Sequence, residues 1–266
     1  MKNIAKLYDQ HSIMLVPLVD EIRKNVKKGD IVIDLGCGSG VYIKLLENKV
    51  GENGKLIGTD IDNEMIKFCK NSFRGKNINF KKIPAEKLSS IKVKADAVFS
   101  SLVLHFTNVK KSLAEIKKVL RPAGKLIFAV PLYRSGIEIF DNEDSKKFRS
   151  KFVENLKTEL KINNIKAKIS LDYANSREKF FKQVVQKNKL KILNWEKSSL
   201  EKANLKVLLE YFKIPLRSEK LLKIPFSVRY KILKTALIKT FREFPNFKSN
   251  RYYLIGVAEK KLKRKC

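Results

Sequence analysis

A glycine-rich stretch offers the strongest candidate for a ligand site. Residues 32–40 read VIDLGCGSG, so an apolar run leads into Gly36, Gly38 and Gly40, and a helical pattern starts near Val41. Glycines let the backbone turn sharply and approach a ligand closely, and a helix N-terminus offers free N–H groups. The spacing G-x-G-x-G differs from the dinucleotide pattern G-x-G-x-x-G, and the absence of a P-loop Lys-Ser/Thr disfavours nucleotide triphosphate hydrolysis. The stretch therefore predicts a site for a ligand other than a dinucleotide or a nucleotide triphosphate.

Two acidic residues near this loop indicate which ligand it would bind. Asp60 ends the next apolar run, about 24 residues further on, where a carboxylate can accept hydrogen bonds from both hydroxyls of a ribose. Asp34 precedes the loop and suits a positively charged amino group, held directly or through water. A nucleoside that carries an amino acid, S-adenosylmethionine, fits both acids.

The elements that position the loop are short apolar runs alternating with helical patterns through the first 134 residues. This alternation predicts a parallel sheet covered by helices on both faces. A last apolar run, Arg251–Lys260, is too isolated to form a sheet alone, so we expect it to join the first sheet. We predict an α/β fold with a Rossmann-like, doubly wound, mostly parallel sheet. The earlier strands are expected at residues 31–35, 55–60, 77–83, 95–100 and 125–130.

The pattern after Pro131 is mainly helical and predicts an insertion after the fifth strand. We expect residues 1–134 and 250–266 to form the domain that binds S-adenosylmethionine. Residues 135–249 are expected to form a mostly helical lid or substrate insertion. Its elements are predicted as a helix through residues 148–160, a helix at 172–187, a strand at 189–196, and helices from 200 to 244 interrupted at Pro215 and Pro225.

Four motifs in order make residues 28–134 resemble the class I S-adenosylmethionine-dependent methyltransferases, of the type 11-like kind. They are VIDLGCGSG at 32–40, IGTDIDNEMI at 57–66, ADAVFSSLVLHF at 95–106 and LRPAGKLIFAVP at 120–131. The resemblance implies that Asp60 binds the ribose, that the loop glycines line the methionine part, and that Ile61 packs on the adenine. The predicted cofactor residues are Asp34, Gly36, Cys37, Gly38, Gly40, Asp60, Ile61, Ala85, Glu86 and Ser100.

One position departs from the family pattern. After the third strand, relatives have D-A-E-x-L with an Asp that contacts the adenine amine, whereas this chain has Pro84 followed by AEKL. Proline has no carboxylate, so Pro84 cannot make that contact. The adenine would instead be recognised by the backbone at Ala85 or by Glu86. The alternative for Glu86 is a solvated position in a loop.

The residues after the fourth strand bear on the methyl acceptor. Residues 100–106 read SSLVLHF, without the N/D-P-P-Y-type motif that holds an amine in many amino-methyltransferases, which disfavours base N-methylation. The stretch is similar to quinone methyltransferases, trans-aconitate methyltransferase and the malonyl-carrier-protein methyltransferase of biotin synthesis. The helical insertion resembles the last two in layout. We therefore expect methyl transfer to oxygen of a small or acyl-carrier-bound acidic molecule.

Three alternatives remain for the function. The first is an RNA-directed methyltransferase that uses the basic insertion as a clamp. The second is a C-methyltransferase of the quinone or lipid type. The third is a protein that binds the cofactor without catalysis.

Two residues are candidates for catalysis. His105 would act as a general base if the acceptor is a phenol, an enol or an amine, and the alternative is a structural role beside Phe106 or below the cofactor. A carboxylate acceptor is ionised at pH 7 and needs no base. Tyr8 lies in a stretch similar to the opening helix that closes over the cofactor in these families, or it packs that helix on the domain. Arg134, beyond the fifth strand, is a candidate for the acceptor side.

The chain is strongly basic. It has 58 Lys and Arg against 27 Asp and Glu, a formal net charge of +31, and 44% hydrophobic residues, enough for an ordinary core. Such a charge attracts nucleic acid, an acidic carrier protein, an anionic membrane surface or anionic small molecules. Biased codon usage is the alternative, because Lys outnumbers Arg 47 to 11. No apolar run reaches the roughly 18 residues of a membrane-spanning helix. Three cysteines without a C-x-x-C pair favour neither disulfides nor zinc, so we expect no metal and a cytoplasmic protein.

The aromatic residues of the insertion bear on RNA binding, because platforms for base stacking must be exposed. Most of them fall at the spacing of a helical core, and we therefore expect burial and no selective binding of RNA. They are Phe148, Phe152, Phe180, Phe181, Trp195, Tyr211 and Phe212.

Overall fold

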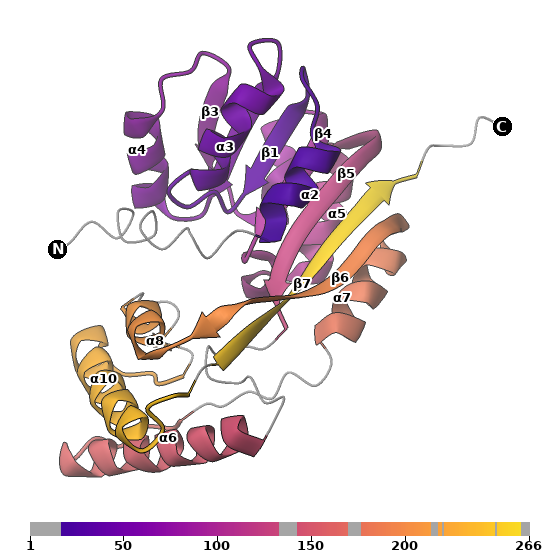
Figure 1. Ribbon diagram of the computed structural model, residues 1–266. Helices are drawn as coiled ribbons and strands as arrows, with labels where there is room; N and C mark the ends of the chain where they lie inside the picture. The colour runs from indigo at the N-terminus through magenta and orange to yellow at the C-terminus, as the bar shows by residue number, and fades with distance from the viewer. Residues whose placement is uncertain are drawn as a thin grey trace. The chain divides into compact units, whose positions relative to one another are not determined.

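A seven-stranded sheet is the central feature of the computed structural model, which describes residues 17–132, 143–169, 177–213, 218–219, 221–247 and 249–261. The strands lie in the order β3-β2-β1-β4-β5-β7-β6 (Figure 1). Neighbours from β3 to β5 pair in parallel, and β7 pairs antiparallel to β5. The strands are β1 (Ile31–Leu35), β2 (Lys55–Asp60), β3 (Ile78–Lys82), β4 (Ala95–Ser101), β5 (Leu120–Pro131), β6 (Leu190–Ala203) and β7 (Ser249–Lys260).

Strand β1 lies in the middle of the parallel part and leads into the glycine loop. Its Val32 is opposite Leu56 of β2 and Ala97 of β4. Parallel strands covered on both faces need apolar residues at successive positions, and the run IVIDL supplies them around the single acidic residue Asp34. The helices of this part are α2 (Pro17–Asn25), α3 (Val41–Val50), α4 (Asn63–Ser72) and α5 (Val109–Val119), with short 3₁₀ helices η2 (Ala85–Ile91) and η3 (Leu104–Phe106).

Side-chain caps show why two of these helices begin where they do. Asp62 Oδ1 accepts a hydrogen bond from Glu64 N at 2.8 Å at the start of α4. Asn108 Oδ1 accepts from Lys111 N at 3.2 Å at the start of α5. Both oxygens satisfy N–H groups that have no partner within the helix.

The last apolar run returns to the first sheet, as the sequence predicts. In β7, Val257 is opposite Ile127 of β5, and Gly256 is opposite Phe128. A Cβ at position 256 would meet the Phe128 ring at 2.4 Å, so glycine lets this ring lie across the neighbouring strand.

The chain divides into two compact units. The first contains residues 1–131, 176–198 and 253–266, and the second contains residues 132–175 and 199–252. Residues 176–198 hold α7 (Arg177–Lys187) and the first part of β6. Phe181 of α7 is stacked with Phe128 of β5, with ring centroids 5.8 Å apart. The insertion expected as one block at 135–249 is therefore interrupted by a segment that belongs with the sheet.

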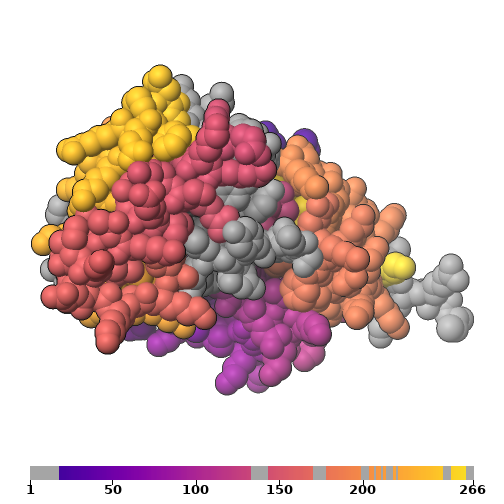
Figure 2. All heavy atoms as spheres, turned by 90° about the horizontal axis from the view of Figure 1, so that it is seen from below, coloured from indigo at the N-terminus to yellow at the C-terminus, as the bar shows by residue number. Residues whose placement is uncertain are grey.

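Three helices build the core of the second unit: α6 (Glu143–Ile162), α8 (Leu205–Phe212) and α10 (Phe226–Glu243). Helices α6 and α10 lie side by side, as both views of the molecule show (Figure 2). Phe148 of α6 stacks on Phe247 with ring centroids 3.8 Å apart. None of the helices in the described ranges is long and apolar enough to cross a membrane.

Burial of the aromatic residues differs from the expectation at one position. Phe148, Phe152, Phe181 and Phe212 are buried, and Trp195 is partly buried. Phe180, the neighbour of Phe181 on α7, is 40% exposed. The side chain of Tyr211 lies outside what the structure describes.

Candidate cofactor site

The glycine loop is fixed to the end of β2 by backbone hydrogen bonds. The N–H groups of Gly36 and Cys37 donate to the Thr59 carbonyl oxygen at 2.7 and 2.9 Å. Gly36 has a φ of 75°, and a Cβ there would meet Val103 Cγ2 at 2.2 Å. Any other residue at position 36 would combine left-handed strain with a clash against a branched side chain. Glycine at this position is therefore required by the protein's own packing.

Gly38 marks the open side of the loop and holds Asp60. Its φ is 51°, and a Cβ at this position would meet no atom of the described residues within 4 Å. The Gly38 N–H donates to Asp60 Oδ2 at 2.9 Å, and the Asp62 N–H donates to Asp60 Oδ1 at 2.9 Å. These bonds orient the carboxylate and leave lone pairs on both oxygens. The two oxygens of Asp60 are therefore held in fixed positions beside open space, where they can accept hydrogen bonds from two neighbouring hydroxyl groups of a ligand.

The charge of Asp60 depends on two opposing effects. Burial raises the pKa of its carboxyl group, and the backbone N–H groups of Asp62 and Gly38 lower it in part. Hydrogen-bond donors from a ligand would add to the second effect, because they favour the ionised form.

Asp34 is the most deeply buried acid of the site. Its side chain is 1% exposed, and Oδ2 has no hydrogen-bond partner among the described residues. Burial, followed by the charge of Asp60, raises the pKa of Asp34 well above its ordinary value. Burial raises the pKa of the Tyr42 hydroxyl group of α3, and the charge of Asp34 adds to this rise. The hydroxyl lies 3.2 Å from Ser101 Oγ, a contact that lowers the pKa in part. A cationic amino group at this place would supply the partner that Asp34 Oδ2 lacks.

We expect Asp34→Asn to stabilise the ligand-free protein in a pH-dependent way. A carboxyl group whose folded pKa is raised binds more protons in the folded state than in the unfolded state, so stability falls as pH rises from about 4 through the folded pKa. The amide variant lacks this loss. Its advantage should be small near pH 4 and reach about 1–3 kcal/mol at pH 8. Urea unfolding of both proteins across this pH range measures the difference in their free energies of unfolding. A difference that does not change with pH would contradict a raised pKa of Asp34.

The structure describes the residues predicted to lie near the adenine. Ile61, which follows β2, is 70% exposed and is available for contact with a ring. Pro84 precedes η2, where Ala85 is buried. Glu86 Oε1 accepts a hydrogen bond from the Asn108 N–H at 2.7 Å. Neither interpretation of Glu86 from the sequence includes this bond, which ties η2 to the start of α5.

The end of β4 and the residues that follow it contain further predicted site residues. Ser100 is fully buried, and its Oγ has no hydrogen-bond partner within the described ranges. The His105 ring is partly buried and packs on Phe106, with ring centroids 3.9 Å apart, and Phe106 is 52% exposed. Both interpretations of His105 stay predictions. Tyr8 and Arg134 lie outside the described residues.

Cys69 of α4 contacts the loop in a way that the sequence does not reveal. The Cys69 thiol of α4 donates to the Gly38 carbonyl oxygen at 3.2 Å. A hydrogen bond with Cys69 and burial raise the pKa of the Cys37 thiol, which therefore stays protonated. The sequence pattern places Cys69 on the apolar face of a helix, but gives no sign that this face reaches the loop. In the part of the chain that the structure describes, no cluster of His, Cys, Asp and Glu could hold a metal ion.

Comparison with protein families gives a match over most of the chain. A family model described as a methyltransferase domain matches residues 26–211. The chain belongs to this methyltransferase family. The predicted class is thereby confirmed, whereas the closer likeness to trans-aconitate and carrier-protein methyltransferases is not confirmed.

Two curated relatives are similar to about half of this methyltransferase. An uncharacterised protein of Methanocaldococcus jannaschii is 34% identical over 132 residues, which cover 48% of each chain. The ubiquinone/menaquinone biosynthesis C-methyltransferase UbiE of Wigglesworthia glossinidia brevipalpis is 29% identical over 154 residues, which cover 52% of this chain and 62% of the relative. The chain thus spans about half the length of the curated relatives it matches.

A solved structure is similar over nearly the whole methyltransferase. It is a complex of the Haloferax volcanii methyltransferase activator Trm112 with its methyltransferase, at a TM-score of 0.57 and 16% identity, covering 99% of this chain and 96% of the other. At this identity the likeness concerns the fold alone, and it confirms the predicted Rossmann-like α/β fold.

Proposed function

We propose that this methyltransferase binds S-adenosylmethionine at the glycine loop and transfers its methyl group to a small acidic acceptor. The observation that carries the cofactor assignment is the Asp60 carboxylate, which Gly38 and Asp62 hold beside the open face of the loop. Two further features support it. Asp34 Oδ2 lacks a partner among the described residues, and the free space at Gly38 leaves room for a ligand.

Each part of the cofactor then has a residue suited to it. Asp60 accepts hydrogen bonds from the two ribose hydroxyls, and Asp34 faces the amino group of the methionine part. The exposed side chain of Ile61 covers the adenine. Cys37 and Gly40 contribute the backbone of the loop, and Ala85 offers backbone groups to the adenine edge.

The chain contributes to the reaction mainly through positioning. When bound, S-adenosylmethionine supplies a methyl group on a sulfonium sulfur, which is a good leaving group. Holding the acceptor in line with that methyl group is worth up to about 7–11 kcal/mol of the barrier. An ionised carboxylate needs no proton removed, and for a phenol or an enol His105 would take the proton and contribute roughly 10²–10⁴-fold.

The charge of the chain supports an acidic acceptor. A net charge of +31 favours encounter with anions. We propose O-methylation of a small or carrier-bound acid, and the runner-up is C-methylation of a quinone-type acceptor. The runner-up is supported by the relatives named as quinone C-methyltransferases.

The experiment uses S-adenosylmethionine with a tritiated methyl group and two sets of acceptors. The first set contains short dicarboxylates and acyl-carrier-bound acids, and the second contains demethylated quinones. The proposal predicts label in the acids, and mild alkali should release that label as volatile methanol, because methyl esters are hydrolysed and C-methyl groups are not. Alkali-stable label in the quinones would replace the proposal with the runner-up.

Weak, salt-sensitive RNA binding is expected from the same charge. The buried positions of Phe148, Phe152 and Phe212 leave these rings unavailable for base stacking. Binding should therefore stay in the nonspecific range, roughly 10⁻⁴–10⁻⁶ M at physiological salt, with a log–log salt slope near −0.7 per phosphate. Filter binding with unrelated RNA sequences measures both quantities. Submicromolar, sequence-selective binding at about 150 mM salt would favour an RNA-directed enzyme instead.

A further inference from the structure

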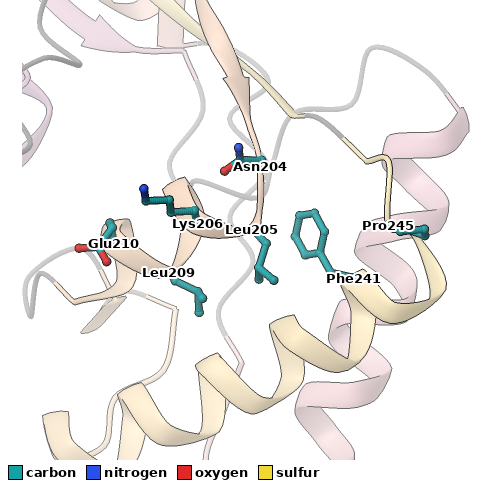
Figure 3. A pocket seen from close by; sticks show the side chains of 7 residues that line it. All are labelled: Asn204, Leu205, Lys206, Leu209, Glu210, Phe241 and Pro245. Carbon is teal, nitrogen blue, oxygen red and sulfur yellow. The ribbon is translucent and has the colours of Figure 1, made fainter.

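The second unit has a hollow between the start of α8 and the end of α10. Its volume is about 580 Å³, within the roughly 300–1,000 Å³ of ligand pockets in proteins. Figure 3 shows Leu205 and Phe241 pointing toward one another across it, with Leu209 beside them. The lining residues are Asn204, Leu205, Lys206, Leu209, Glu210, Phe241 and Pro245, all within residues 199–252.

The floor of this hollow is apolar. Leu205 and Leu209 are partly buried and pack against the core of the unit, and Phe241 is 7% exposed. Pro245 extends the apolar lining past the end of α10. Contact with a hydrocarbon chain or ring would remove the exposed parts of these side chains from water.

The rim carries one available positive charge. Lys206 is exposed and forms no ion pair with any residue that the structure describes. The acid on the same rim, Glu210, is paired with Lys213 one turn along the chain. Of the two charged residues that line the hollow, Glu210 therefore already has a cationic partner among the described residues, and Lys206 has no acidic one.

We propose that this hollow binds an amphiphilic carboxylate, with the hydrocarbon part on Leu205, Leu209 and Phe241 and the carboxylate at Lys206. A single lysine suits one negative charge, whereas phosphate groups are held more often by the planar fork of arginine. The proposal is independent of methyl transfer, because the residues involved belong to the second unit and none is assigned to the cofactor.

The test measures binding of 11-(dansylamino)undecanoate by fluorescence, without S-adenosylmethionine. We expect a saturable rise in emission that dodecanoate reverses and dodecylammonium does not. Lys206→Glu should weaken binding about 3- to 10-fold, because it removes one exposed charge pair and puts a repelling charge in its place, and the effect should shrink at high salt. Leu209→Asn should weaken it further, because it places an amide on the apolar floor.

Lys231→Glu is the matched control. It makes the same charge change on an exposed position of α10, ten residues before Phe241 and so about 15 Å away along the helix. We expect less than about a 2-fold effect from it. Equal losses in Lys206→Glu and Lys231→Glu would show that the probe responds to overall charge, and would overturn the proposal. Displacement of the probe by dodecylammonium as readily as by dodecanoate would also overturn it.

Discussion

Asp60→Asn should weaken the binding of S-adenosylhomocysteine about 10- to 150-fold. The variant keeps the shape of the side chain but loses the charge that two ribose hydroxyls would meet, and hydrogen bonds to a charged group are worth about 1.5–3 kcal/mol. Gly38 and Asp62 each donate to a different oxygen of Asp60, and the amide nitrogen of Asn cannot accept, so the variant also loses one of these two bonds. Isothermal titration calorimetry measures the loss directly.

Asp96→Asn is the control for this result. Asp96 accepts from the Ile31 N–H at 2.8 Å and pairs with Arg121, at the opposite ends of β1 and β4 from the loop. We expect a lower free energy of unfolding for this variant and unchanged affinity for the ligand. If Asp60→Asn binds as tightly as the wild type, the ribose lies elsewhere.

Gly38→Ala should abolish most of the ligand affinity while the protein stays folded. The new methyl group would enter a space where no atom in the described part of the chain lies within 4 Å, and where we place the ligand. Steric overlap of this kind costs about 1–3 kcal/mol, or roughly 5- to 150-fold in affinity. Left-handed backbone at an alanine costs a further 1–2 kcal/mol or so of stability.

Gly29→Ala separates strain from obstruction. Gly29 has a φ of 87° and also no atom within 4 Å of a Cβ, but it precedes β1 at the other end of the strand. Both variants should lose similar stability in urea unfolding, and only Gly38→Ala should lose affinity for S-adenosylhomocysteine. Equal affinities in the two variants would mean that the open side of Gly38 does not face the ligand.

The parts of the fold that local sequence determines could be predicted closely. Strands β1 and β2 lie at the predicted residues, because each is a short apolar run that ends at a glycine turn or at an acid. Asp62 caps α4, and an N-cap of this kind can be predicted from neighbouring residues alone. Asp34 and Asp60 lie near enough for the charge of one to raise the pKa of the other, as parallel neighbouring strands require.

Contacts between distant residues could not be predicted in this way. Glu86 meets Asn108, 22 residues further on, and Cys69 reaches Gly38 from a helix that the pattern shows only as apolar on one side. The return of residues 176–198 to the first unit has the same cause. In this segment, Phe181 and Trp195 both pack on Phe128 of β5, a contact between residues far apart in the sequence.

The most direct test of the cofactor assignment is a calorimetric titration of the wild-type chain with S-adenosylhomocysteine. We predict saturable binding of one molecule per chain, which added S-adenosylmethionine competes away and NAD does not. Absence of binding up to about 1 mM ligand, equivalent to a free energy weaker than about −4 kcal/mol, would contradict the assignment of the glycine loop.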